Sequence, residues 1–285
     1  MRVGITGASG FIGAHLLRAL ANRADVAAAA FCRPRSAHPP TVQDLAPFVK
    51  DKDIIYHLGG VNRGGEADLI EGNITGTFNL IRAVQAAGKP VRVIFASSAQ
   101  VYKPPRKALP LPETHAAEPA GLYGVCKKTA EDLIRLSGLD YILLRLTNVY
   151  GPGCRPNYNS VVATFCRRAA DGLPLTVNGT GRQGRDFIYI DDVVQAFLLT
   201  AGPRRKSSVY NVGSGRITSL RTVLQNIRRV LPETQVAYRT ETAADESSYC
   251  CDNSRFMKQY GWKIRTSLRK GIETTLAHAR EKTDA

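Results

Sequence analysis

The sequence has no long hydrophobic run. None of its apolar stretches approaches the roughly 18 consecutive residues that a membrane-spanning helix requires. Its start shows no leader pattern either, because Met1 and Arg2 lead directly into a short strand-like stretch. Both absences argue against a membrane protein or a secreted one, and we expect a cytoplasmic protein.

Cysteines with the spacing of a metal site are also missing. The six cysteines are scattered along the chain, no two of them have the CxxC spacing, and no histidine cluster accompanies them. We therefore expect free thiols and no bound metal.

Acidic residues are scarce relative to basic ones. The chain has 24 Asp and Glu against 39 Lys and Arg, which gives a net charge of +15. Such a surface attracts anions, so nucleic acid and phosphate-bearing metabolites are both candidate ligands. The basic residues are spread out, however, without a block of five or more. We favour an anionic metabolite, with a non-catalytic dinucleotide-sensing or RNA-binding protein as the alternative.

What is present in the first half is an alternation of β-rich runs and helical stretches. It predicts parallel strands joined by crossover helices, an α/β doubly wound (Rossmann) sheet. The predicted strands are residues 2–6, 25–31, 53–58, 91–96 and 141–146, and the predicted helices are residues 11–22, 42–50, 73–87 and 123–137.

The spacing of the second and third predicted strands is unusually short. Only 21 residues, 32–52, separate them, and four of these are prolines. That length holds a loop and one short helix, so we expect a sheet that is one βα element short.

The second half has a different texture, with loops rich in Gly, Pro and Asn between helices predicted at 160–170, 191–200, 220–230 and 268–279. We expect a dinucleotide-binding domain at 1–150 and a smaller, mainly substrate-binding lobe at 151–285. Segments near 187–214 are expected to return to the first domain.

A glycine-rich turn at residues 7–13, GASGFIG, follows the first predicted strand and opens the first helix. Gly7 permits the tight turn, Gly10 lets the backbone approach a diphosphate, and Gly13 lets the helix pack on the strand. The helix start, at Phe11 and Ile12, offers free N–H groups to an anion. The turn in this context predicts a dinucleotide site.

The residues after the second predicted strand bear on the choice of dinucleotide. An NAD site places an acidic side chain there, whereas the 2′-phosphate of NADP favours arginine. Here Arg33 and Arg35 occur, and no acidic residue follows until Asp44. We therefore expect NADP in preference to NAD, the alternative being an arginine pair on a solvated loop.

Tyr123 and Lys127 lie four residues apart on a predicted helix and therefore on one face of it. A free tyrosine has a pKa near 10, and a neighbouring cation favours the phenolate and lowers that pKa. This spacing is also common on solvated helices. Ser98, however, directly follows the strand predicted at 91–96, at the sheet edge where ligands bind, and can hydrogen-bond a substrate oxygen.

With these motifs the chain resembles the extended short-chain dehydrogenases/reductases, the NAD(P)-dependent epimerase/dehydratase family that acts on nucleotide sugars. The resemblance runs from residue 1 to about 275. Its motifs are the glycine turn, Ser97-Ser98 before Val101-Tyr102, the YxxxK of Tyr123 and Lys127, RLTNVYGPG at 145–153, GRDFIYIDD at 184–192 and YNVG at 210–213.

The resemblance implies roles for individual residues. Ser98, Tyr123 and Lys127 would be catalytic, and Asn73 would lie near the nicotinamide and order the lysine. Leu58, Gly59 and Ser97 would join the cofactor site. Asn148 and Arg185 would contact the nucleotide diphosphate, and the substrate site would include Asn157 and Asn159. A homodimer through the helices at 73–87 and 123–137 is also implied.

Three chemistries share this scaffold in the family. A 4,6-dehydratase is disfavoured, because Ala99 and Gln100 follow Ser98 where dehydratases have an acidic pair. The remaining two are a 4-ketoreductase, which usually takes NADPH, and a 4-epimerase of the UDP-hexose type, which usually holds NAD.

Three features favour the reductase: Arg33, the short segment 32–52, and the runs 57–63 and 155–166. Those runs resemble bifunctional reductases of capsular-polysaccharide synthesis, which reduce a UDP-linked 4-keto-6-deoxy-N-acetylhexosamine. The sequence shows no counterpart of their appended cupin-type domain, and it keeps the GRDFIYIDD run of epimerases. We expect NADPH-dependent reduction of a UDP-, dTDP- or GDP-linked 4-keto sugar. We expect His57 to end a core strand rather than to act as a base.

Overall fold

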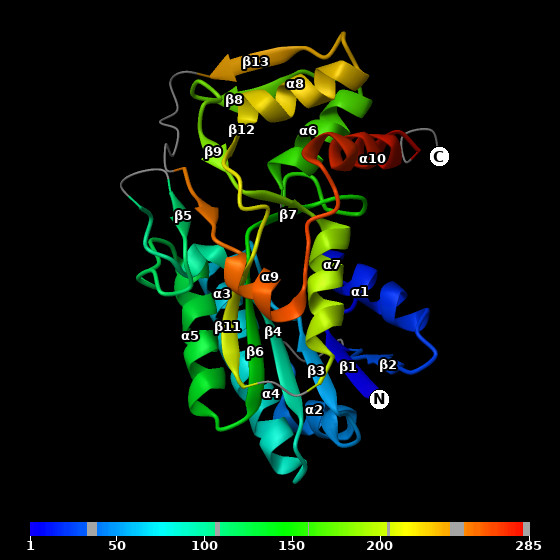
Figure 1. Cartoon of the computed structure of the whole chain (residues 1–285), viewed down its shortest axis with the longest axis vertical. Coiled ribbons are helices and arrows are strands. Elements are labelled where there is room, and N and C mark those ends of the chain that lie inside the picture. The colour runs from blue at the N-terminus through cyan, green and yellow to red at the C-terminus, as the bar shows by residue number, and fades with distance from the viewer. Residues whose placement is uncertain (33–38, 106–108, 159, 204–205, 240–247, 282–285) are drawn as a thin grey trace.

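The computed structural model describes residues 1–32, 39–105, 109–158, 160–203, 206–239 and 248–281. Its centre is a six-stranded parallel sheet in the order β11-β6-β4-β3-β1-β2 (Figure 1). The strands are β1 Arg2–Thr6, β2 Ala27–Ala30, β3 Ile54–His57, β4 Arg92–Ser98, β6 Asp140–Leu146 and β11 Ser208–Val212.

Helices cover both faces of this sheet. On one face α1 (Phe11–Ala21) packs beside α7 (Ile190–Thr200). On the other lie α2 (Val42–Val49), α4 (Gly76–Ala86) and α5 (Leu122–Leu136). Successive strand residues alternate between the two cores, as the period of two along a strand requires. In β4, for example, Ile94 belongs to the first core and Val93 to the second.

The doubly wound fold predicted from the sequence is confirmed, and the sheet is one βα element short. Among the described residues between β2 and β3, α2 is the only helix or strand. The chain then enters β3, which pairs with the opposite edge of β1 from β2. A capping box between Thr41 and Asp44 starts α2 where the loop ends.

The helix predicted at residues 73–87 begins earlier than expected. It starts with α3 (Glu66–Ile70), continues through a π-helical turn (Glu71–Thr75), and only then becomes α4. The side chain of Asn73 lies in the π-helical turn and donates to the backbone oxygens of Leu69 and Val61. These side-chain bonds accompany the wider turn and bury Asn73.

Most of the remaining elements lie above the carboxyl ends of the strands in Figure 1. The helices predicted in the second half are present as α6 (Val161–Ala170), α7, α8 (Leu220–Val230) and α10 (Leu268–Glu281). Short pairs link them, namely β7 (Asn148–Tyr150) with β10 (Phe187–Tyr189), β8 (Leu175–Asn178) with β13 (Val236–Arg239), β9 (Gly184–Arg185) with β12 (Thr218–Ser219), and β5 (Pro110–Leu111) with β14 (Cys250–Cys251).

Two further short helices complete the chain, the 3₁₀ turn η2 (Ala99–Val101) directly after β4 and α9 (Ser254–Tyr260) beside β11. β11 itself adds the sixth strand to the sheet by pairing with β6. The domain boundary at residue 150 stays a prediction. Within the described part of the chain, every helix is too short or too polar to cross a membrane.

Candidate active site

The glycine turn between β1 and α1 leaves no room for side chains at two positions. Gly7 has a φ of +73°, and a Cβ there would lie 2.6 Å from the backbone nitrogen of Gly59. A Cβ on Gly13 would lie 2.1 Å from the carbonyl oxygen of Gly7. The close approach of α1 to β1 therefore requires glycine at both positions.

The start of α1 opens on a long cleft of about 450 Å³ that Gly10, Phe11 and Ile12 line. Gly10 is the N-cap, and no side chain caps the helix. The first-turn N–H groups therefore face the cleft without a side-chain acceptor, an arrangement that fits the diphosphate of a dinucleotide.

The predicted catalytic residues line the same cleft farther along. Ser98, Tyr123 and Lys127 come from the end of β4 and the first turns of α5. Burial raises the pKa of Tyr123, while the neighbouring Ser98 acts in the opposite direction. From the sequence we expect a neighbouring cation to lower this pKa; instead desolvation is the largest cause and raises it. Tyr123 is therefore a protonated phenol at neutral pH.

Lys127 is a buried cation beside this phenol. Its Nζ donates to the carbonyl oxygen of Ala96 at 3.1 Å and lies 5.8 Å from the centroid of the Tyr123 ring. Burial lowers the pKa of Lys127 to about 8, while the charge of Glu131 acts in the opposite direction. The ammonium form is therefore the main one at neutral pH.

Asn73 lies close to Lys127 but does not bond it directly. A Cβ added to Gly60 would lie 2.6 Å from Asn73 Oδ1 and 3.3 Å from Lys127 Nζ, so both atoms face the same small space. Asn73 Oδ1 is buried without a hydrogen-bond partner among the described residues. The ordering of Lys127 by Asn73 stays a prediction.

His57 ends β3 in the core, as expected, and both its ring nitrogens are engaged. Nδ1 shares a hydrogen bond with Thr6 Oγ1 at 2.7 Å, and Nε2 with Thr77 Oγ1 at 2.9 Å. Burial, reinforced by the charge of Lys127, lowers the pKa of His57 to about 3. The imidazole is neutral and occupied, so it is unsuited to act as a base. No three metal-binding side chains are grouped within the described ranges.

A second cavity of about 300 Å³ joins the long cleft, and Ser98 and Asn148 line both. Arg185 lines this cavity from β9, and its Nη1 donates to the carbonyl oxygen of Gly184 at 2.8 Å. The side chain of Asn148 donates to the carbonyl oxygen of Asp186 at 3.1 Å. The structure thus brings these two predicted substrate residues together with the hydroxyl of Ser98.

Asp186 organises the wall of this second cavity. Its buried carboxylate accepts N–H groups from Ser214 at 2.6 Å, Gly215 at 3.2 Å and Cys251 at 3.0 Å. Desolvation outweighs these bonds and raises the pKa of Asp186. One side chain therefore ties the loop after β11 and the strand β14 to the segment that carries Arg185.

Several predicted site residues lie elsewhere or outside the described residues. Asn157 lines neither cavity; it is exposed with a φ of +59°, and its N–H donates to Thr164 Oγ1. Gly59 lies behind Leu58, which does line the cleft, and donates its N–H to Thr6 Oγ1. Arg33, Arg35 and Asn159 lie outside the described residues.

Other residues that line these cavities were not predicted from the sequence. Arg155 and Tyr158 line the long cleft, Tyr249 lines the second cavity, and Gln100 and Thr147 line both. The hydroxyl of Tyr158 donates to the carbonyl oxygen of Arg63 at 3.3 Å, which holds the loop across the cleft. The sequence held one local sign of this loop's conformation: asparagine, which adopts the left-handed region more readily than most residues, stands at Asn157 directly before Tyr158.

Comparisons with known proteins agree with this geometry. Residues 3–213 match the model of the NAD dependent epimerase/dehydratase family. A UDP-2-acetamido-2,6-beta-L-arabino-hexul-4-ose reductase of Pseudomonas aeruginosa is 31% identical over 83% of this chain and 61% of its own length. This chain thus spans about three fifths of that relative.

Two further proteins are similar over almost their whole length. A UDP-glucose 4-epimerase of Mycolicibacterium smegmatis is 30% identical over 99% of both chains. The structure of RMD from Pseudomonas aeruginosa, complexed with NADPH, has a TM-score of 0.88 at 26% identity and covers 99% of both chains. The resemblance inferred from the motifs is confirmed, and the protein belongs to the NAD-dependent epimerase/dehydratase family.

Proposed function

We propose that the protein reduces the 4-keto group of a nucleotide-diphosphate-linked deoxyhexose with NADPH, with Tyr123 as the proton donor. One observation carries the proposal. Ser98 and Asn148 line both the long cleft and the second cavity, so the glycine turn, the predicted catalytic hydroxyls and Arg185 open on two adjoining cavities.

The cofactor end of these cavities suits a dinucleotide diphosphate, because the start of α1 lacks a side-chain cap and the glycines permit close approach. A bound NADPH would supply the hydride that reaches the sugar carbon. Support for NADPH over NAD comes from Arg33 and Arg35 and from the NADPH complex of RMD. The cytoplasmic location and the homodimer stay predictions.

The protonation states of Tyr123 and Lys127 indicate which group donates the proton in this reaction. As C4 accepts the hydride and its C=O π-bond breaks, the carbonyl oxygen takes the proton of the Tyr123 hydroxyl, so an alcohol and a phenolate form. Burial keeps Tyr123 protonated beforehand. The ammonium of Lys127 stabilises the phenolate, which regains its proton from water, and Ser98 holds the substrate oxygen against Tyr123.

The substrate end suits a nucleotide diphosphate. The guanidinium of Arg185 lines the second cavity and provides a forked donor for phosphate oxygens. The reductase from Pseudomonas aeruginosa acts, by its name, on a UDP-linked hexulose. We therefore propose a UDP-linked 4-keto-6-deoxy-N-acetylhexosamine as the first substrate to examine, with dTDP- and GDP-linked sugars as further candidates.

An NAD-dependent 4-epimerase is the second candidate. The similarity to the UDP-glucose 4-epimerase over 99% of both chains favours it, and it would use the same Ser98, Tyr123 and Lys127. In that reaction the hydride leaves C4 and returns to the opposite face, so no cofactor is consumed.

Accounting for the cofactor separates the two candidates. With the 4-keto sugar, the reductase consumes one NADPH for each alcohol formed. Absorbance measures the NADPH consumed, and chromatography measures the reduced nucleotide sugar. With UDP-glucose, we expect no UDP-galactose. If the protein epimerises UDP-glucose without net cofactor change and leaves the keto sugar unreduced, the reductase proposal is wrong and the epimerase is the function.

A further inference from the structure

A fully buried carboxylate lies behind the catalytic residues. Glu131 follows Lys127 by one helical turn on α5 and has no exposed surface. It accepts from the hydroxyl of Ser97 at 2.5 Å and, through both oxygens, from Arg145 at 2.9 and 2.6 Å. The carboxylate thus joins α5 to the residue before Ser98 on β4 and to β6.

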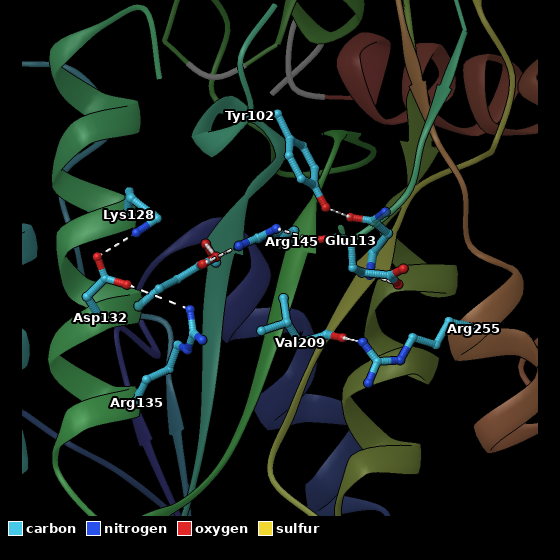
Figure 2. Close-up of polar contacts among 11 residues, drawn as sticks. Tyr102, Glu113, Lys128, Asp132, Arg135, Arg145, Val209 and Arg255 are labelled. Carbon is cyan, nitrogen blue, oxygen red and sulfur yellow. Dashed lines mark hydrogen bonds and ion pairs between the residues drawn. The ribbon is translucent and has the colours of Figure 1, made fainter. Parts of the chain in front are cut away.

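The partner arginine is itself held from the other side. The Arg145 guanidinium lies 4.7 Å from the centroid of the Tyr102 ring, and its Nη1 donates to the carbonyl oxygen of Glu113 at 3.3 Å. The hydroxyl of Tyr102 donates to Asn211 Oδ1 at 2.6 Å (Figure 2). Taking an ion pair out of water is costly, and apolar side chains of similar volume often stabilise a fold as well. Stability alone is therefore a weak explanation for this pair.

The next residue of the helix provides a contrast. Asp132 pairs with Lys128 at 2.5 Å and with Arg135 at 3.9 Å on the solvent side of α5 (Figure 2). Its side chain is 43% exposed, so solvent and salt screen its charge. Two adjacent carboxylates on one helix thus have opposite surroundings.

We propose that Glu131 is a positioning residue for the reaction described above: it fixes the turn of α5 that carries Lys127 against the strand that carries Ser98, and it supplies the buried counter-charge of Lys127. Only the effect of Glu131 on turnover rests on the proposed function. The contacts and the charge balance hold for any chemistry that uses Lys127.

The charges around Lys127 give the proposal a measurable sign. On α5 it faces Tyr123, Cys126 and Glu131, and β3 presents the neutral His57. From β4 come two uncharged groups, the carbonyl oxygen of Ala96 and the ring of Phe95, whose centroid lies 4.7 Å from Nζ. Glu131 raises the pKa of Lys127 against the desolvation that lowers it to about 8. Without this carboxylate, the ammonium would lose its proton at a lower pH.

Carbon-13 NMR of protein labelled at the lysine ε-carbons measures this directly, with the Lys127 signal assigned by its loss in Lys127→Met. We expect the wild-type signal to titrate near pH 8 and the Glu131→Gln signal about one pH unit lower. Asp132→Asn is the matched control, because it removes the same charge from the neighbouring, exposed position. It should titrate as the wild type does.

Glu131→Gln leaves Arg145 without its buried partner and can unfold the protein. The double variant Glu131→Met with Arg145→Met removes both charges at similar volume and should still titrate at the lower pH. Identical Lys127 midpoints in the wild type and in a folded variant would overturn the proposal.

Turnover of the 4-keto sugar adds the catalytic readout. In the Glu131 variants kcat should fall increasingly as the pH rises, with the KM for NADPH unchanged. If the wild-type protein does not reduce the sugar, the proposed function fails, and the titration still decides the role of Glu131.

Discussion

The proposed cofactor side and the proposed substrate side of the site are built in different ways. On the cofactor side, residues contiguous in sequence form the turn between β1 and α1, and buried Ser98 and Lys127 stand on a strand and a helix. On the substrate side, Arg185 comes from a two-residue strand far along the chain, and Asp186 beside it bonds the loop after β11. Within this family fold, the difference suggests a rigid cofactor side and a substrate side that changes with its loops.

Tyr123→Phe tests the catalytic centre where the two sides meet and should have the largest effect. The ring still packs, but no proton can be donated, so kcat should fall by about 10²- to 10⁴-fold. The Kd for NADPH, measured by fluorescence titration, should stay as in the wild type. Full turnover in this variant would contradict the mechanism.

Gly13→Ala tests the rigidity of the cofactor side. The new Cβ would lie 2.1 Å from the carbonyl oxygen of Gly7, so α1 must move from β1. We expect a loss of stability of about 1–3 kcal/mol in thermal unfolding and weaker NADPH binding by about tenfold. Gly65→Ala is the control, because its Cβ would meet only Asp68 Oδ2 at 3.5 Å with a φ of −64°. Equal NADPH affinities in the two variants would show that the turn is adaptable.

Arg185→Ala should have a smaller effect, confined to the substrate side. Loss of a charge-assisted contact to the diphosphate should raise the KM for the nucleotide sugar by about tenfold and leave the Kd for NADPH unchanged. Arg185→Lys keeps the charge without the forked geometry and should recover only part of the loss. An equal loss of NADPH affinity would show that Arg185 also supports cofactor binding, and would contradict the separation of the two sides.

The parts that could be predicted from the sequence are those with local causes. The glycine turn shows in the sequence as a motif of seven residues, although the crowding at Gly7 comes from Gly59. The short segment 32–52 limits by its length what can lie between β2 and β3. The π-helical turn at Glu71–Thr75 was missed, because the carbonyl of Val61 that helps to hold Asn73 comes from another segment.

The sequence by itself determined the doubly wound fold, through its alternation of strands and helices, and the family, through its motifs. The catalytic set of Ser98, Tyr123 and Lys127 stays a prediction. Only the tertiary structure decided the electrostatics. Tyr123 is a protonated acid rather than a phenolate, because desolvation by the surrounding protein raises its pKa. The pairing of Glu131 with Arg145 likewise joins residues that only the packing of α5 on the sheet brings within 2.6 Å.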